Sequence, residues 1–375
     1  MPAPSDPTPF ERAKAEFLAG LACQQAGQLE QAATHYQVSL RLLPGRASTL
    51  INLAATQLQL QRPQEALAAA DAALAAEPDA AEAWLHRATA LAELGERPLA
   101  LAAFDRVLAA QPTHAFAWSS RGSLLRELGR LGEAAQAFRQ AALHGADPAL
   151  QAYYLAAVDA PEPAPPQAPA AYVRGLFDSY SDDFERHLVG TLRYQAPQRL
   201  VDGLRAAAPG ERFAAALDLG CGTGLCGPLV RPLVDRLVGL DLSPRMLERA
   251  RGRAVYDQLE QADAAAFLAH TEARFELVLA ADVFIYIGDL APVFAGIARV
   301  MARGVFSFSV EPAPEGDAPV LQPSLRYSHP AGYLQRLASE FGFTPLAMTR
   351  GPVRQDQGGD VEGLYVHLRR ERAGA

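Results

Sequence analysis

The chain has 375 residues, of which 50% are hydrophobic and 20% charged, and it carries a formal net charge of −8. This length is sufficient for two or three domains, each with its own core. The negative charge argues against a general nucleic-acid-binding protein, because phosphate binding needs an excess of basic side chains on some face. Lys14 is the only lysine, so the second half of the chain has no lysine to form a Schiff base or bind a phosphate.

The three cysteines are Cys23, Cys221 and Cys226, and they have neither the number nor the spacing of a disulfide framework or a zinc site. No segment approaches the roughly 20 apolar residues that span a bilayer. Residues 1–9 also lack the apolar stretch of a signal peptide. We therefore expect a cytoplasmic protein with reduced thiols that binds no metal, no membrane and no nucleic acid.

A 34-residue period runs through the first part of the chain, because Pro44, Pro78 and Pro112 are spaced by that number. Other positions repeat in the same register. Twelve residues before these prolines stand Ala32, Ala66 and Ala100, and eight residues before them stand Tyr36, Ala70 and Phe104.

This pattern resembles the tetratricopeptide repeat over about residues 11–146. The resemblance implies helix–turn–helix units that bury their apolar faces only by stacking on one another. We predict a repeat domain over residues 10–158, with about four repeats and a capping helix at 149–158. Arrays of this kind bind peptides or other domains on a concave surface, which predicts a protein partner. Dimerisation, or cover for another domain, stays open. Trp84 and Trp118 are expected to pack in the core.

Residues 159–170 contain five prolines and no helical periodicity. Proline density favours a semi-extended spacer. We predict that this segment is a linker and the boundary between two domains.

A glycine-rich turn follows an apolar run in the second half. Residues 214–219 read as a buried strand, and Gly220, Gly222 and Gly224 follow it. A helix and a second strand, 236–240, then lead to Asp241. Glycines let a backbone approach a ligand closely, and an acid after the second strand accepts the hydroxyls of a ribose. A nicotinamide site is one interpretation, but Asp218 beside the loop would repel a pyrophosphate.

Asp218 and the three glycines resemble motif I of class I S-adenosylmethionine-dependent methyltransferases, and the resemblance extends over about residues 172–370. It implies an α + α/β protein, in which a Rossmann-like, seven-stranded domain over residues 171–370 follows the α-solenoid of repeats. Further strands are expected at 275–281, 305–310, 344–350 and 363–368, and a helix is expected to begin at 283–287. The implied cofactor contacts are Asp218, Gly220, Gly222, Gly224, Asp241, Leu242, Asp263, Asp282, Tyr172 and Tyr180.

Candidates for the acceptor side are fewer. Asp282, Tyr286 and His329 are candidate catalytic residues, and His187 is a further candidate near the pocket mouth. Arg326, Arg350 and Arg354 are candidates for clamping a substrate carboxylate. Asp282 is followed by Val-Phe and not by the N/D-P-P-Y/F sequence of enzymes that methylate amide or exocyclic base nitrogens. This difference argues against such acceptors.

These features predict methyl transfer from S-adenosylmethionine to an oxygen or nitrogen atom. The acceptor is a small carboxylic metabolite or a protein that the repeats recruit. The alternative is a cofactor-binding regulator or assembly factor without catalysis.

Overall fold

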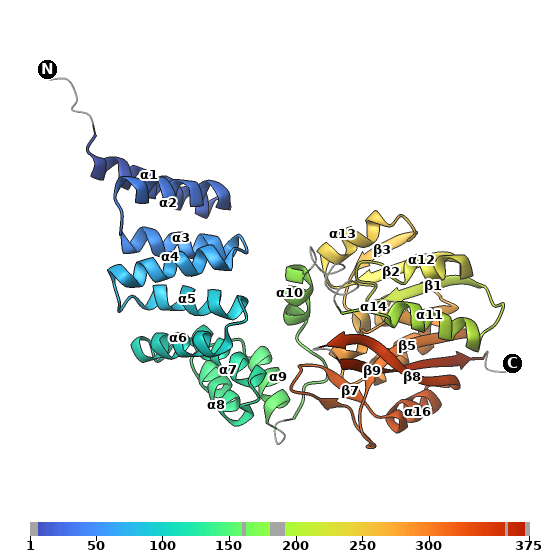
Figure 1. Cartoon of the computed structure of the whole chain (residues 1–375). Helices are drawn as coiled ribbons and strands as arrows, with labels where there is room; N and C mark the ends of the chain where they lie inside the picture. The colour runs from blue at the N-terminus through green and yellow to red at the C-terminus, as the bar shows by residue number, and fades with distance from the viewer. Residues whose placement is uncertain (1–6, 160–162, 181–191, 357–358, 372–375) are drawn as a thin grey trace. The chain divides into compact units, whose positions relative to one another are not determined.

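The computed structural model describes residues 7–159, 163–180, 192–356 and 359–371, without the side chains of Ser179, Tyr180 and Asp356. The chain divides into two compact units, Met1–Asp159 and Ala160–Ala375 (Figure 1). No helix in the described residues is long and apolar enough to cross a membrane.

The first unit is an α-solenoid of antiparallel helix pairs (Figure 1). Each pair corresponds to one period of the sequence repeat, and the last helix stacks on the fourth pair. The helices are α1 (Pro9–Gln25), α2 (Leu29–Leu42), α3 (Ala47–Gln59), α4 (Pro63–Ala76), α5 (Ala81–Glu93), α6 (Arg97–Ala110), α7 (Ala115–Glu127), α8 (Leu131–Leu143) and α9 (Pro148–Val158).

A small residue on the first helix of each pair faces the repeated aromatic position on the second. A Cβ atom added at Gly20 would lie 2.6 Å from the ring of Tyr36, and one added at Gly122 would lie 2.5 Å from the ring of Phe138. The corresponding residues of the second repeat are Ala54 and Ala70, both fully buried. Glycine thus lies opposite the aromatic ring in the first and fourth repeats, and two alanines meet in the second, so the contact is close-packed in each of them.

The two tryptophans join consecutive repeats. The indole N–H groups of Trp84 and Trp118 donate to the main-chain carbonyls of Pro78 and Pro112, each at 2.8 Å. These carbonyls belong to the prolines that follow α4 and α6. The tryptophans are only partly buried and pack against the core of the solenoid rather than inside it, and their polar atoms are satisfied.

The second unit is built on one mixed sheet with the strand order β3-β2-β1-β4-β5, extended beyond β5 by the antiparallel strands β9 and β8. The first five strands are parallel. They are β1 (Phe213–Leu219), β2 (Val234–Asp241), β3 (Gln258–Gln261), β4 (Leu277–Ala280) and β5 (Gly304–Pro312), and the closing pair is β8 (Thr344–Asp356) and β9 (Gly359–Arg370).

Helices cover both faces of this sheet. They are α10 (Ala170–Tyr180), α11 (Ala196–Ala207), α12 (Gly227–Val230), α13 (Pro244–Gly252), α14 (Ala264–His270), α15 (Ala291–Val300) and α16 (Ala331–Glu340), with 3-10 turns η2 (Arg231–Leu233) and η3 (Phe284–Tyr286). The core between sheet and helices is rich in aromatic rings, with Phe294 in contact with Phe306 and Phe308.

One expectation about elements needs correction. The segment 283–287 is a 3-10 turn, η3, and the helix that follows β4 begins only at Ala291. The expected seven-stranded sheet is present, and two short strands, β6 (Val320–Leu321) and β7 (Tyr327–His329), are added at the end of β5. These two strands form within the loop that precedes α16.

The last residues of the proline-rich segment are held by the second unit. The carbonyl of Pro166 accepts the N–H groups of Gly288 and Asp289, each at 2.8 Å. The N–H of Ala168 donates to the carbonyl of Tyr286 at 2.8 Å, and the Tyr327 hydroxyl donates to the carbonyl of Pro165 at 2.6 Å. We name residues 165–168 the strap.

Candidate functional site

A cavity of about 210 Å³ opens at the carboxyl ends of the parallel strands. In open α/β sheets this edge is where ligands bind, because the strand-to-helix loops diverge there. The acids that follow β2, β3 and β4 line it together with Asp218 of β1, namely Asp241, Asp263 and Asp282.

The glycine loop after β1 forms one wall and needs glycine for two reasons. Gly220, Gly222 and Gly224 have φ angles of +67°, +55° and +82°, in the left-handed region that favours glycine. A Cβ atom at Gly220 would also lie 2.6 Å from Val283. At Gly222 an added Cβ would meet nothing within 4 Å, so the backbone itself borders the cavity there.

Asp218 lies near the centre of the site, on the strand that precedes the loop. Its carboxylate accepts the hydroxyl of Tyr256 at 2.6 Å and is 1% exposed. Burial raises the pKa of Asp218 from 3.8 to about 6, the Tyr256 hydrogen bond lowers it, and the charge of Asp241 raises it again. At neutral pH this aspartate is mostly ionised and offers a negative charge to the cavity.

Asp241 joins the end of β2 to the glycine loop. Its two oxygens accept the N–H groups of Gly222, at 2.9 Å, and Ser243, at 2.8 Å. Burial is the main cause that raises its pKa, and these hydrogen bonds oppose the rise. Asp263 caps helix α14 by accepting the N–H of Ala266 at 3.0 Å, and Leu242 lies beside these acids in the cavity wall.

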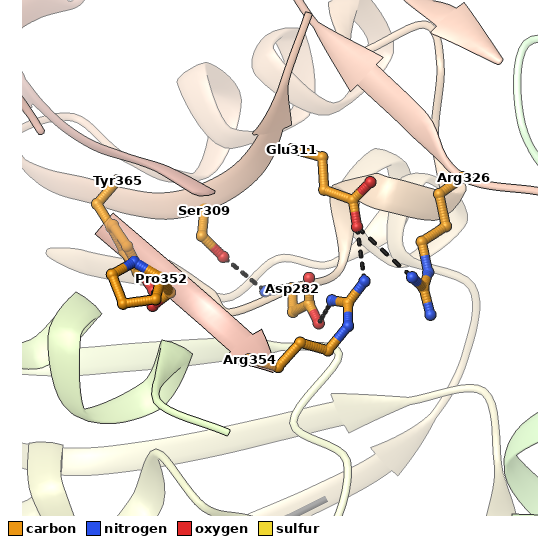
Figure 2. Close-up of polar contacts among 7 residues, drawn as sticks. All are labelled: Asp282, Ser309, Glu311, Arg326, Pro352, Arg354 and Tyr365. Atoms are coloured by element: carbon orange, nitrogen blue, oxygen red, sulfur yellow. Dashed lines mark hydrogen bonds and ion pairs between the residues drawn. The ribbon is translucent and has the colours of Figure 1, made fainter. Parts of the chain in front are cut away.

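A second group of charged side chains lies at the end of β4 and β5 (Figure 2). Arg354 of β8 forms ion pairs with Asp282, at 3.4 Å, and with Glu311, at 2.8 Å. Arg326 lies 3.7 Å from the same Glu311 oxygen. The N–H of Asp282 donates to the Ser309 hydroxyl at 2.8 Å. Asp282 itself has a φ of +59°, which is rare for a residue other than glycine.

Aromatic and apolar side chains complete the wall. The rings of Phe177 and Tyr286 meet edge to face with centroids 5.7 Å apart. Val173 and Phe177 of α10 line the cavity, whereas Tyr172 does not. Tyr172 is close enough to Tyr286 to raise the pKa of its hydroxyl. The Tyr180 side chain and His187 lie outside the described residues.

Two predicted acceptor-side residues lie away from the cavity lining. His329 is fully buried, and its Nε2 atom donates to the main-chain carbonyls of Ile287 and Gly288 at 3.0 and 3.3 Å. This placement favours a structural role over that of a base, and burial lowers its pKa to about 4. Arg350 is 61% exposed and pairs with Glu362 at 3.1 Å. The cavity brings together only Arg326 and Arg354 of the three arginines.

The two units match different protein families. Residues 216–304 match the family described as methyltransferase domain, and residues 51–115 and 87–150 match the tetratricopeptide repeat. The second unit contains a methyltransferase domain. Tetratricopeptide repeats precede it. The predicted fold class is therefore confirmed, and so is S-adenosylmethionine as the cofactor of such a domain.

The curated relatives overlap this domain only in part. Malonyl-[acyl-carrier protein] O-methyltransferase of Enterobacter lignolyticus is 40% identical over 81 residues, which are 22% of this chain and 32% of that protein. The protein of the same name from Salmonella typhimurium is 28% identical over 132 residues, 35% of this chain and 50% of that protein. The chain thus spans about half or less of the curated relatives it matches.

Among solved structures, a magnesium protoporphyrin IX methyltransferase from Synechocystis PCC 6803 covers 54% of this chain and 100% of its own length. Its TM-score is 0.42 at 17% sequence identity.

The residues of the methyltransferase domain fit its cofactor. The open space at Gly222 lets the ligand lie against the loop backbone. Asp241 accepts main-chain N–H groups of Gly222, Ser243 and Leu242, which uses three of the about four acceptor positions of a carboxylate and leaves capacity for a ribose hydroxyl. The ionised Asp218 complements the positive charge of a sulfonium or amino group. In the described residues no cluster of His, Cys, Asp or Glu is able to hold a metal ion.

Several residues of the site were not predicted from the sequence. Glu311 could have been predicted, because it stands near the end of the strand that follows Asp282, and acids at strand ends are common in this fold. Tyr256 and Tyr194 gave no signal, since nothing in the local pattern places them by the loop. Gln167 and Ala168 line the cavity from within the proline-rich segment, whose composition alone indicates only a spacer.

Proposed function

We propose that the protein transfers a methyl group from S-adenosylmethionine to a carboxylate oxygen of an acid. The main support for this proposal is that one cavity is lined both by residues suited to the cofactor and by arginines. The glycine loop, Asp218 and Asp241 form a cofactor site, and Arg326 and Arg354 add positive charge to the same cavity. Arginine is the residue best suited to binding a carboxylate, because its planar fork of donors matches two oxygens.

The titratable groups of the cavity favour an acceptor that arrives already ionised. Asp282 is engaged by Arg354, and its pKa is raised chiefly by burial. Burial raises the pKa of Tyr286 to about 12, and it also raises the pKa of Tyr194 well above its usual value. Both tyrosines are therefore protonated at neutral pH, and the carboxylates of Asp218 and Asp282 are already engaged by Tyr256 and Arg354. A carboxylate acceptor needs no base, since its own pKa lies near 4.

The domain then acts mainly by alignment. S-adenosylmethionine supplies an activated methyl group on a positively charged sulfur. A carboxylate oxygen attacks the methyl carbon in line as the carbon–sulfur bond breaks, and the electron pair of that bond stays on sulfur. The ester forms without loss of a proton. Phe177, Tyr286 and Val173 exclude water from this step and fix the approach of the acceptor.

The acceptor acid is either a free metabolite or an acid carried by a protein. Two curated relatives are named as O-methyltransferases of malonyl-[acyl-carrier protein], which supports an oxygen acceptor. Tetratricopeptide repeats are a common platform for protein recruitment. We propose that the repeats bind the partner protein on their concave face and deliver its acid group or regulate the reaction.

Calorimetric titration tests the cofactor site. Wild-type protein should bind S-adenosylmethionine with micromolar affinity, and Asp241→Ala should weaken binding about 100-fold. The reason is the loss of a charge-assisted hydrogen bond to the ligand, which contributes about 1.5–3 kcal/mol. A matched control is Asp235→Ala, because Asp235 is an exposed aspartate of β2 that pairs with Arg212. Wild-type protein that released no heat on titration would refute the proposal.

Radiolabelled methyl transfer separates the enzyme from a cofactor-binding regulator. Cell lysate is incubated with the protein and labelled S-adenosylmethionine and then split into protein and small-molecule fractions. We expect label that is released by mild base, as a methyl ester is. Cofactor binding without any labelled product would favour the non-catalytic regulator, and base-stable label would show a nitrogen acceptor.

A further inference from the structure

The charged residues at the end of β4 and β5 are not equivalent. Arg354 is 5% exposed, and its two terminal nitrogens are committed to Asp282 and Glu311 (Figure 2). Asp282 alone can compensate Arg354 if Glu311 is neutralised, but removing both partners would leave a buried charge without compensation, which is strongly destabilising. Arg354 therefore holds the two carboxylates of the site in place.

Arg326 is bound much more loosely. Its nearest Glu311 oxygen is 3.7 Å away, beyond the distance of a hydrogen bond, and that same oxygen already accepts from Arg354 at 2.8 Å. The side chain of Arg326 is 29% exposed and lines the cavity. Arg326 also hydrogen-bonds the hydroxyl of Tyr286, which lies in the cavity wall. A guanidinium has five donors, so most of its capacity is left for a ligand.

The formal charges of the two arginines and the two acids at the ends of β4 and β5 sum to zero before any ligand is added. Arg326 and Arg354 carry two positive charges, and Asp282 and Glu311 carry two negative ones. An ionised acid supplies the negative charge that Arg326 needs when it leaves Glu311, whereas a neutral or cationic acceptor supplies none.

We propose that Arg326 is the residue that binds the carboxylate to be methylated, and that Glu311 is its resting partner, which Arg326 exchanges for the substrate. Arg354 keeps Glu311 and Asp282 in both states. This assignment rests on the function proposed above and makes it specific. It selects acids with one ionised carboxylate at the reacting end, and it makes Glu311 a positioning residue that acts through Arg326.

The exchange also accounts for release of the product. Esterification removes the negative charge that paired with Arg326, so the ester loses its charge-assisted hydrogen bonds. Glu311 is 3.7 Å away and again becomes the closest anion to Arg326. The acid should therefore bind far better than its own methyl ester.

Monomethyl malonate is the probe, because it has one carboxylate, and dimethyl malonate is its uncharged control. Each is titrated into full-length protein saturated with S-adenosylhomocysteine, with binding followed by ligand-observed NMR. We expect the acid to bind wild-type protein and the diester not to bind. Arg326→Met should weaken acid binding about tenfold or more, the loss expected for one charge-assisted pair. Arg350→Met is the matched control, because that arginine lies outside the cavity, and it should leave the affinity unchanged.

Glu311→Gln distinguishes exchange from a structural role. Removing the competing anion should strengthen acid binding several-fold, and Glu311→Asp should restore wild-type affinity. A merely structural Glu311 would instead weaken it when replaced. Arg326→Met with wild-type acid affinity would overturn the assignment, as would wild-type protein that binds neither probe. All variants should keep their affinity for S-adenosylhomocysteine. If wild-type protein does not bind S-adenosylhomocysteine, the proposed function itself fails.

Discussion

Asp282 has a left-handed backbone conformation, which is uncommon outside glycine. Its φ of +59° costs of order 1–3 kcal/mol, and neighbouring contacts must compensate this. The Ser309 hydroxyl binds its N–H, and Arg354 binds its carboxylate. Both contacts come from strands that follow Asp282 in the sequence. The closing strand β8 is therefore needed to hold a residue that follows β4, and this part of the site forms only when β5 and β8 have joined the sheet.

The ionisation of Asp218 should control cofactor binding as pH changes. Its pKa is raised to about 6, so lowering the pH through 6 neutralises the charge that attracts a cationic ligand. We expect the affinity for S-adenosylmethionine to be constant above about pH 7 and to fall below pH 6. Tyr256→Phe removes the hydrogen bond that lowers this pKa, so the midpoint should rise by about one pH unit. Calorimetric titrations between pH 5 and 8 measure it.

The matched control for this prediction is Tyr36→Phe. That tyrosine donates to Gln24 within the repeats, so its loss should leave the midpoint of cofactor binding in place. An unchanged midpoint in Tyr256→Phe would show that Asp218 does not set the pH dependence.

Residues of the site differ in how far the sequence predicts them. Asp218, Asp241 and Asp282 follow from local pattern, because each stands at the end of an apolar run that reads as a strand. The sequence identifies Arg326 and Arg354 as candidates for binding a carboxylate, but it gives Arg350 the same standing. Whether Arg350 or Arg354 of β8 faces the cavity depends on the register of β8 with β9, which shifts between Pro352 and Arg354.

At the scale of elements, the repeats show how a turn residue is chosen. The turn between paired helices has a positive φ in each of the four repeats, +75° at Gly27, +79° at Gly95 and +74° at Gly129. Gln61 takes this position in the second repeat, with a φ of +58°. A side chain other than glycine in this region costs roughly 1 kcal/mol. The second repeat is thus strained where its sequence departs from the pattern.

Replacing this glutamine should stabilise the repeats. Gln61→Gly should raise the free energy of unfolding by roughly 0.5–1 kcal/mol, because the strain of the left-handed conformation is removed while some chain entropy is lost. Gly95→Gln is the matched reverse change, since an added Cβ there meets nothing within 4 Å and only the backbone conformation matters. Thermal unfolding followed by circular dichroism measures both. Equal melting temperatures for Gln61→Gly and wild type would contradict the strain argument.

Elements with a strong repeating pattern were the most predictable. The helix pairs follow from a period of 34 residues, and β1 and β2 follow from apolar runs bounded by glycine and aspartate. The turn η3 was predicted as a helix start, because residues 283–287 are apolar, a composition that does not separate a 3-10 turn from a helix. Strands β6 and β7 have two and three residues, too few to show alternation.

At the scale of the whole molecule, the open question is where the catalytic domain begins. The sequence places the linker at 159–170 and the domain at 171. The strap at 165–168 nevertheless forms main-chain hydrogen bonds with Tyr286, Gly288 and Asp289, and Gln167 and Ala168 line the cavity. We propose that the functional methyltransferase domain includes the strap and that only the first residues of the proline-rich segment act as a spacer.

Two truncated proteins test this boundary. A protein that begins at residue 163 keeps the strap and should bind S-adenosylhomocysteine within about threefold of the full-length protein, because the described residues that line the cavity belong to the second unit. A protein that begins at residue 171 loses the strap's hydrogen bonds, each contributing about 1 kcal/mol, and should bind at least tenfold more weakly and unfold at lower temperature. Equal affinity of the two proteins would place the boundary at 171. Weak binding by both would mean that the repeats support the cofactor site.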